Sequence, residues 1–285
     1  MRALHTAATG MMAQELNVQV ISNNIANVRT TGYKRQRVHF QDLLYEHQRR
    51  AGSATSEQNT MVPAGISIGS GVKTVSTGRV MTQGNMTPTD KQFDVALRGE
   101  GFFRIRLPDG RTAYSRDGSF DLDAQGQLVT RDGYQVEPGI TVPNNATSVS
   151  INAQGTVEAT MPGQTAPQQL GQIQLARFIN KVGLESLGDN LFIETAGSGP
   201  AIDGVGGGEG FGTLQQNYLE EGNVQAVTEL SSLIAAQRDA GEQRAPRDLA
   251  DRRPHLAELV VRAGIARAPL DHDVAGRERL AARDR

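Results

Sequence analysis

The chain has 285 residues and a formal net charge of −2 at pH 7, so its overall charge gives no reason to expect binding to nucleic acid or acidic membranes. The absence of cysteine excludes disulfides and cysteine-based metal or nucleophile sites. No run approaches the ~18 consecutive apolar residues that a transmembrane helix needs.

Residues 1–32 predict an N-terminal assembly helix that ends in a turn. Apolar residues recur at seven-residue spacing at Leu4, Met11, Val18 and Ile25, and Ile21 lies at a companion position. This spacing forms one apolar seam along a helix, and a seam needs a partner. Thr30, Thr31 and Gly32 end the helix, because threonine disfavours helix and glycine tolerates a left-handed backbone. We expect order chiefly on assembly; the alternative is a surface helix docked on its own domain.

Three runs near this turn carry a family signature. They are Ala8–Met11, Asn23–Val28 and Thr31–Lys34, and together they closely resemble the N-terminus of bacterial flagellar rod and hook proteins. The motif positions that the resemblance marks are Asn23, Asn24, Ala26, Asn27, Thr31, Gly32, Tyr33 and Lys34. The run Phe40–Tyr45 is similar to the distal part of the rod in particular. The resemblance extends to about residue 238.

Residues 33–80 predict an extended arm with a hairpin insertion. Residues 46–64 are polar and rich in Ser, Thr, Gln and Gly, which is typical of an exposed loop or hairpin. The resemblance implies that an insertion here contacts neighbouring subunits. Between Ile66 and Val80 apolar residues alternate with Gly and Ser, which predicts strands.

Residues 81–195 predict an outer β domain. Short apolar-alternating segments are separated by turns such as Pro108–Gly110, Arg116–Gly118 and Arg131–Gly133 at intervals of about ten residues. This spacing is typical of an all-β unit.

The remaining family-like region predicts a flexible Gly-rich linker over 196–213 and a C-terminal assembly helix over 214–238. The helix would supply the partner seam with Leu219, Val227, Leu230 and Ile234. We interpret Glu220 and Glu221 as acidic residues near its N-terminus, where they favour the helix dipole. The predicted fold is therefore α+β, with paired terminal helices of coiled-coil type and a mostly antiparallel β domain.

Residues 239–285 break the resemblance. This tail contains ten Arg and no Lys, and its prolines Pro254 and Pro269 forbid a continuous helix. Our hypothesis is a frameshift near codon 239, in the gene or in its sequencing, and a poorly ordered tail. The alternative is a genuine extension that binds an anionic partner, although interspersed acidic residues make the tail nearly neutral.

The sequence shows no set of residues arranged for catalysis, no cofactor site and no metal site. Gly65–Gly69 matches the GxSxG nucleophile elbow around Ser67. That elbow needs a strand before it and a helix after it, and here apolar alternation continues through the motif. A Gly-rich strand is the favoured interpretation, and an exported β-rich serine hydrolase is the alternative.

The resemblance implies a structural function. Many copies would form a helical tube in the bacterial periplasm that carries torque from motor to hook and encloses an export channel. The implied partners are further copies, other rod proteins, the hook protein and surrounding ring proteins, with no nucleic acid and no membrane insertion. Export would follow the flagellar type III route without a cleaved signal. The alternative within the family is a proximal rod or hook protein.

Overall fold

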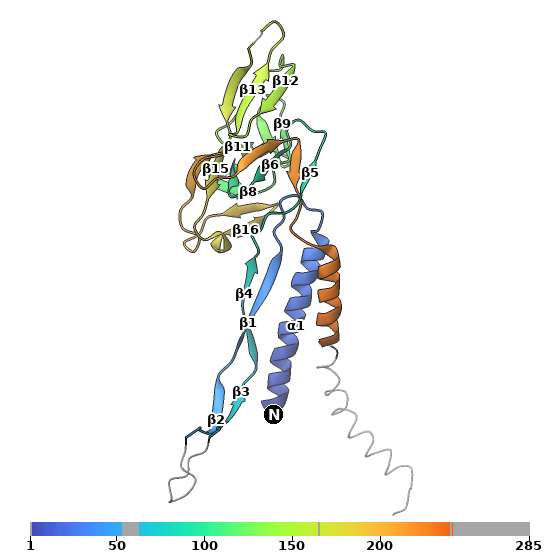
Figure 1. Ribbon diagram of the computed structural model, residues 1–285, viewed down its shortest axis with the longest axis vertical. Helices are drawn as coiled ribbons and strands as arrows, with labels where there is room; N and C mark the ends of the chain where they lie inside the picture. Colours follow the sequence, from blue (N-terminus) through green and yellow to red (C-terminus); the bar gives the residue numbers. More distant parts are fainter. Residues whose placement is uncertain (1, 53–62, 165, 240, 242–285) are drawn as a thin grey trace, which may run out of the picture. The chain divides into compact units, whose positions relative to one another are not determined.

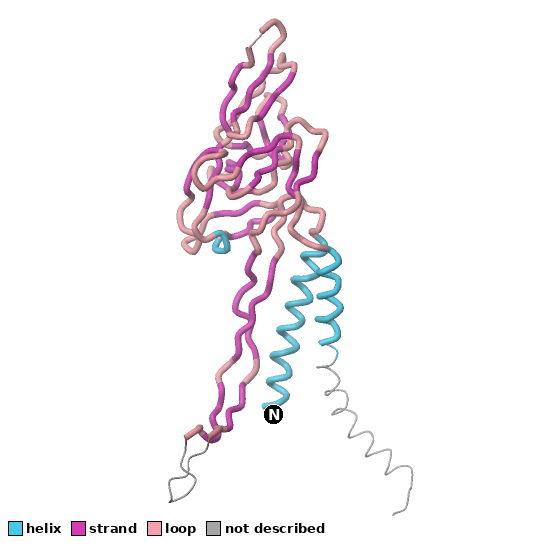
Figure 2. Tube along the Cα trace, viewed as in Figure 1, coloured by secondary structure: helices cyan, strands magenta, loops and turns pink. Residues whose placement is uncertain are grey.

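The computed structural model describes residues 2–52, 63–164, 166–239 and 241. Within these ranges, two helices lie near the ends of the chain and antiparallel strands lie between them (Figures 1 and 2). The fold is α+β with mostly antiparallel sheets, as the sequence predicts. A coiled-coil geometry for the helices stays a prediction. Apart from Asp239 and Gly241, the predicted tail lies outside the described residues.

Helix α1 covers Arg2–Ala26 and so ends before Thr30–Gly32, where the sequence predicts its end. The amide of Asn27 donates to the Asn23 carbonyl at 3.1 Å, and the amide of Thr30 donates to the Asn27 carbonyl at 3.1 Å. Gly32 then has a φ of +66°, in the left-handed region that glycine reaches without a Cβ penalty. The chain can therefore reverse direction and enter the first strand.

Two strand pairs form the arm, which follows the turn. The arm strands are β1 (Gln36–Asp42), β2 (Tyr45–Arg49), β3 (Ile66–Gly69) and β4 (Val72–Arg79). β1 pairs antiparallel with β4, with an irregularity between His39 and Phe40, and β2 pairs antiparallel with β3. Most arm side chains are exposed, with Val38 and Gly78 the buried positions of β1 and β4.

The β domain occupies the centre of the chain. Its first strands are β5 (Met86–Pro88), β6 (Val95–Arg98), β7 (Phe102–Arg106), β8 (Thr112–Ser115), β9 (Phe120–Leu122), β10 (Leu128–Thr130), β11 (Gln135–Val136) and β12 (Ser148–Ile151). They are followed by β13 (Thr156–Thr160), β14 (Gln168–Gln172), β15 (Gln174–Arg177), the 3₁₀ turn η1 (Lys181–Gly183), β16 (Glu185–Gly188), β17 (Leu191–Ile193), β18 (Ile202–Val205), β19 (Thr213–Gln216) and β20 (Tyr218–Glu220). The largest sheet has nine strands, and β12, β13 and β14 form a separate sheet.

The core of the β domain comes from inward-facing side chains of these strands. Its largest buried cluster includes Val95, Leu97, Phe103, Phe120, Leu175 and Leu214. Phe103 and Phe120 meet edge to face, with ring centroids 5.1 Å apart. Leu214 belongs to this cluster although it comes from the C-terminal part of the chain, so that part is anchored in the domain.

The predicted linker over 196–213 is wrong, because part of it forms β18. This strand pairs antiparallel with β15. A Cβ at Gly204 would collide with the Phe211 ring, so the glycine makes room for that side chain. In this segment glycine permits close packing, so its Gly-rich composition alone wrongly predicts a flexible linker.

The predicted helix over 214–238 starts too early. Helix is present over 226–239, whereas β19 and β20 occupy the first part of the predicted range. β19 pairs with β6 and β20 pairs with β5. These pairings bury Leu214 and Leu219, and burial in the sheet overrides the local helical spacing. Neither described helix is both long and apolar enough to cross a membrane.

Replacing Phe103, which is 0% exposed, by alanine should lower the free energy of unfolding by about 3–5 kcal/mol, since the change leaves a cavity in the largest cluster. Val75→Ala, at a side chain 56% exposed in the arm, should change it by less than about 0.5 kcal/mol. Urea unfolding followed by circular dichroism measures both. Equal effects of the two substitutions would contradict this assignment of the core.

Candidate functional site

The motif residues gather where α1, the arm and the β domain meet. Asn24 is 2% exposed, and its side-chain amide pairs with the backbone of Gln36: Nδ2 donates to the Gln36 carbonyl and the Gln36 amide donates to Oδ1, each at 2.9 Å. The Tyr33 hydroxyl donates to Oδ1 of Asn24 at 3.1 Å and to Oδ1 of Asn23 at 2.9 Å. These bonds fasten the end of α1 to the start of β1.

Gly32 brings this turn against the β domain. A Cβ at this position would lie 2.7 Å from the Asp117 amide nitrogen and 2.8 Å from the Arg116 carbonyl carbon. Both neighbours are backbone atoms, which cannot move aside as the end of a flexible side chain can. The Gly32 amide also donates to the carbonyl of Glu220 at 2.7 Å. Only glycine satisfies both the positive φ and the close approach.

The Glu220 carboxylate lies at the centre of the junction. It accepts from Lys34 Nζ on Oε1 and from Arg116 Nε on Oε2, each at 2.6 Å, and the Gly84 amide donates to Oε1 at 2.9 Å. The three ionised side chains are at most 6% exposed. Lys34 follows the turn, Arg116 follows β8 and Glu220 lies on β20, so one carboxylate joins three segments that are far apart in sequence.

Backbone carbonyls supply the remaining partners of the two cations. Arg116 donates to the carbonyls of Gly101 at 2.6 Å, Leu97 at 3.1 Å and Gly99 at 2.5 Å. Lys34 Nζ donates to the Thr82 carbonyl at 2.8 Å. Buried charges are tolerated when they are paired and hydrogen-bonded, and these groups meet that condition.

The environment shifts the pKa values of two of these groups. Burial alone would raise the pKa of Glu220, but the charges of Arg116 and Lys34 and the hydrogen bonds more than offset it, so the pKa lies below its ordinary value. Burial lowers the pKa of Lys34, and the Glu220 carboxylate opposes this effect only in part. The carboxylate is therefore held in its charged form.

Asn223 provides a second connection to the same region. The Arg35 amide donates to its Oδ1 at 2.7 Å, and its Nδ2 donates to the carbonyls of Val80 at 2.7 Å and Thr82 at 3.0 Å. This side chain thus joins the residues after β20 to the end of the β1–β4 pair where β1 begins and β4 ends.

The two helices lie side by side near the junction (Figures 1 and 2). Glu229 on the second helix is 5% exposed; its Oε1 lies 3.0 Å from a guanidinium nitrogen of Arg35, and its Oε2 accepts from Asn24 Nδ2 at 3.3 Å. A groove of about 470 Å³ is lined by both helices and β1, including Val20, Ile21 and Ala236.

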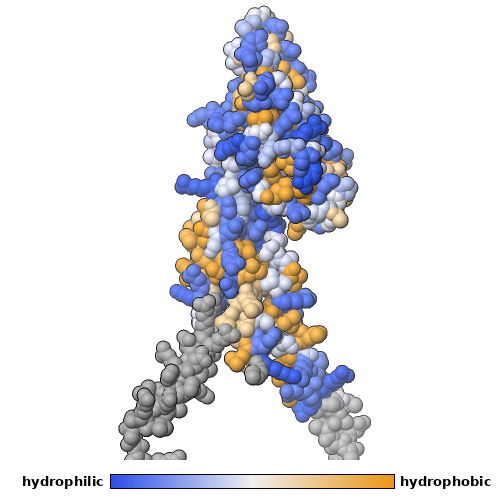
Figure 3. Space-filling model, turned by 180° about the vertical axis from the view of Figure 1, so that it is seen from behind, coloured by the Kyte–Doolittle hydropathy of each residue, from blue (hydrophilic) through white to orange (hydrophobic). Residues whose placement is uncertain are grey.

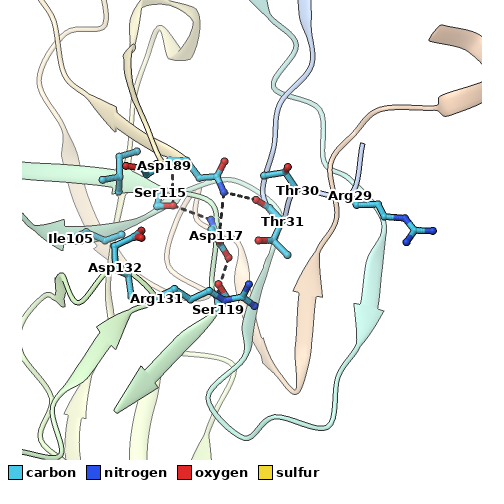
Figure 4. A pocket seen from close by; sticks show the side chains of 13 residues that line it. Arg29, Thr30, Thr31, Ile105, Ser115, Asp117, Ser119, Arg131, Asp132 and Asp189 are labelled. Atoms are coloured by element: carbon cyan, nitrogen blue, oxygen red, sulfur yellow. Dashed lines mark hydrogen bonds between the residues drawn. The ribbon is translucent and has the colours of Figure 1, made fainter. Parts of the chain in front are cut away.

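A polar cavity of about 360 Å³ lies on the other side of the signature turn (Figure 4). Asn190 Nδ2 donates to the Thr31 carbonyl at 3.1 Å and to Oδ2 of Asp117 at 3.4 Å. The Ser115 hydroxyl donates to the Asn190 carbonyl at 3.0 Å. The turn before β17 therefore holds the signature turn from the β-domain side. The side chains around this cavity join the signature turn to the β domain, and they do not place a nucleophile beside a base.

Two family models match the chain. Residues 4–34 match "Flagella basal body rod protein", and residues 96–159 match "Flagellar hook protein FlgE/F/G D1 domain". The flagellar basal-body rod protein FlgG of Caulobacter vibrioides is 55% identical over 238 residues, which cover 84% of this chain and 91% of that protein. The chain belongs to the FlgG family of flagellar basal-body rod proteins. This membership makes it a structural component of the flagellar basal body and not an enzyme.

Other FlgG proteins and a hook protein are similar over different lengths. FlgG of Borreliella burgdorferi is 48% identical over 240 residues, 84% of this chain and 90% of its own length. The hook protein FlgE of Helicobacter mustelae is 35% identical over 192 residues, 65% of this chain and 41% of its own length. The chain is thus similar to FlgG proteins over nearly their whole length.

The structure does not bring all the predicted seam residues together. Ile21 is buried and Met11, Val18 and Ile25 are half-buried on α1, whereas Leu4 is 51% exposed. Leu219 is buried on β20 and not on a helix. The other three C-terminal seam residues are exposed: Val227 by 79%, Leu230 by 48% and Ile234 by 52%. Apolar surface gathers over this helix and along the arm (Figure 3). The seam stays a prediction about the assembled state.

The interpretation of Glu220 as a helix N-terminal acid is wrong, because Glu220 lies on β20 and the helix starts at 226. Sequence reasoning also missed Arg116, Asn190, Asn223 and Glu229 as junction residues. Arg116 and Asn223 lie within the part of the chain, up to about residue 238, that resembles the family, and that resemblance could have singled them out. Asn190 carries no motif; its φ of +59° is visible only in the structure.

The GxSxG match does not form a nucleophile elbow. Ser67 is exposed on β3, and the chain continues into β4 and not into a helix. Ser67 is therefore part of a strand of the arm, and membership of the FlgG family excludes the hydrolase alternative.

Glu220→Gln should lower the free energy of unfolding by about 3 kcal/mol at pH 7, since it leaves two buried cations without a counter-charge. In the folded chain the pKa of Glu220 lies below its ordinary value of 4.5. The ionised carboxylate therefore contributes stability above pH 4.5, and this contribution is lost as the pH falls through the pKa of the folded state. The difference between wild type and Glu220→Gln, measured by urea unfolding, should therefore shrink on acidification. The control is Glu221→Gln at the exposed neighbour; a pH-independent difference for Glu220→Gln would contradict the assignment.

Proposed function

We propose that the chain is a structural subunit of the distal part of the flagellar rod. Copies polymerise into a helical tube that spans the periplasm, transmits torque from motor to hook and encloses the channel for exported subunits. The observation that carries this proposal is the set of large apolar side chains exposed on the C-terminal helix: Val227, Leu230 and Ile234. In a lone chain they face water, and burial by a neighbour would stabilise each by part of the about 1.5–3 kcal/mol that burying a fully exposed side chain contributes.

Assembly through the terminal helices follows from this exposure. The exposed side chains recur at helical spacing, and Leu4 of α1 is exposed as well. Coiled-coil-type packing of both helices against neighbouring copies buries them. A seam that is marginal in one chain becomes rigid when each helix contacts several others. The junction around Glu220 then ties each β domain to the packed helices, so that torque passes between them.

The same proposal names location and partners. The chain is exported by the flagellar type III route without a cleaved signal, and it contacts other rod proteins, the hook protein and the surrounding periplasmic and outer-membrane rings. The relatives named FlgG support the rod over the hook, since the FlgE relative matches over 41% of its own length. The insertion over 46–64, which favours the distal rod over the proximal rod, lies mostly outside the described residues.

Ile25→Asp should prevent incorporation into the rod while leaving the β domain folded, because it places a charge on the half-buried seam of α1. The variant carries an epitope tag and is expressed in Caulobacter vibrioides lacking its own FlgG; swimming and recovery of the chain in purified basal bodies are scored against the tagged wild-type chain.

Ser148→Asp, at an exposed position of β12, is the matched control and should assemble like wild type. Normal incorporation of Ile25→Asp contradicts the seam. If the wild-type chain is exported but absent from basal bodies, the proposed function itself is wrong.

For the tail we propose a frameshift near codon 239. Resequencing of the genomic DNA across codons 230 to 286, with translation in all three frames, should find a frame that restores an Ala-Tyr-Glu step and an apolar heptad before a nearby stop. If no frame does so, the tail is a genuine extension and the frameshift proposal is wrong.

A further inference from the structure

Two buried cations of the junction share a single carboxylate. Lys34 and Arg116 each lie 2.6 Å from a Glu220 oxygen, and within the described residues neither cation has a second acidic partner. The cluster therefore buries a net positive charge, and a buried charge without a counter-charge is costly. A chemical change that neutralised Lys34 would leave Arg116 and Glu220 as a balanced pair.

The Lys34 amine has the surroundings of a nucleophile. Its side chain is 3% exposed, and burial lowers the pKa of Lys34, which favours the neutral amine. Removal of a lysine from water in this way activates its amine for attack on a carbonyl carbon. Oε1 of Glu220 lies 2.6 Å from Nζ and can accept a proton from the ammonium. A nucleophile and a base therefore lie side by side.

A carboxamide lies next to this amine. Nζ of Lys34 donates to the Thr82 carbonyl oxygen at 2.8 Å, and Nδ2 of Asn223 donates to the same oxygen at 3.0 Å. The amine and the carboxamide are therefore neighbours on one acceptor. Lysine carries its ammonium on a flexible four-carbon stem, so rotation of the side chain can bring Nζ onto Cγ of Asn223.

The Asn223 carboxamide is held in a way that suits attack. Its Oδ1 accepts from the backbone amide of Arg35 at 2.7 Å. A backbone N–H in this position stabilises the negative charge that develops on the oxygen when a nucleophile adds to the carbon. A cavity of about 110 Å³, lined in part by Lys34, Thr82 and Arg116, borders the amine. The cavity has room for a leaving group the size of a water molecule.

We infer that Lys34 and Asn223 become joined by an isopeptide bond within the folded chain. Glu220 takes a proton from the Lys34 ammonium, and the freed lone pair of Nζ adds to Cγ of Asn223. Glu220 then gives its proton to Nδ2, the Cγ–Nδ2 bond breaks and ammonia leaves. The new amide passes its extra proton through Glu220 to the ammonia, which departs as ammonium. The carboxylate is restored, the excess buried charge leaves with the product, and the step needs no oxidant or reductant.

The bond connects the two helical segments of the chain. Lys34 follows α1 through the signature turn, and Asn223 precedes the helix that starts at 226. A force that separates the two helices then acts on a covalent bond as well as on ion pairs. The bond forms inside one chain, so it depends neither on assembly nor on the proposed function.

Mass spectrometry of the purified, folded wild-type chain tests the bond. The intact mass should lie below the mass of the sequence by one ammonia. Trypsin does not cleave after an acylated lysine, so the digest should contain a branched peptide in which residues 30–35 are linked to Asn223 through Lys34. Loss of ammonia from elsewhere in the chain would not produce this branch.

Five variants separate the reacting groups from exposed residues of the same type. Lys34→Arg and Asn223→Ala each remove a reacting group and Glu220→Gln removes the base, so these chains should keep the full mass of their sequences. Lys91→Arg and Asn145→Ala, at exposed positions, are the matched controls and should lose one ammonia like wild type. A folded wild-type chain of full mass, or a branch that joins any other pair, overturns the inference. Either result is measured on single chains and leaves the proposed function standing.

Discussion

The structure depends on one buried carboxylate. Glu220 binds Lys34 from the signature turn and Arg116 from the β domain, each at 2.6 Å, while its own backbone belongs to β20. A buried ion pair adds little net stability compared with well-packed apolar residues, but removing one partner is costly. The cluster therefore acts mainly as a constraint: the helices, the arm and the β domain can meet in one arrangement, in which all three charges are satisfied.

This constraint gives physical meaning to the family signature. Asn24 pairs with the backbone of Gln36, Gly32 allows a close approach to Arg116 and Asp117, and Lys34 reaches Glu220. These residues act within the chain, whereas the exposed apolar side chains of the C-terminal helix and the arm face outward. The junction sets the internal geometry of the chain, and in the proposed rod the outward residues would join neighbouring copies.

Sequence reasoning predicted the parts that depend on local chemistry. The change of direction at Gly32 after α1 and the β domain follow from glycine conformation and alternating apolar residues. It failed where tertiary contacts decide: Leu219 has helical spacing with Val227, yet pairing of β20 with β5 buries it in a sheet. Gly204 suggests a linker but accommodates Phe211. Glu220 and Arg116 are separated by 104 residues, a pairing that no local pattern encodes.

A double-mutant cycle between Arg116 and Glu220 tests the central claim most directly. The free energy of unfolding is measured at pH 7 for the wild type, Arg116→Met, Glu220→Gln and the double variant. If the carboxylate holds the segments together through Arg116, the coupling free energy should be about 1.5–3 kcal/mol, and the double variant should be less destabilised than the sum of the singles. A coupling free energy near zero would show that the two side chains act independently, and the junction could not then be the constraint described.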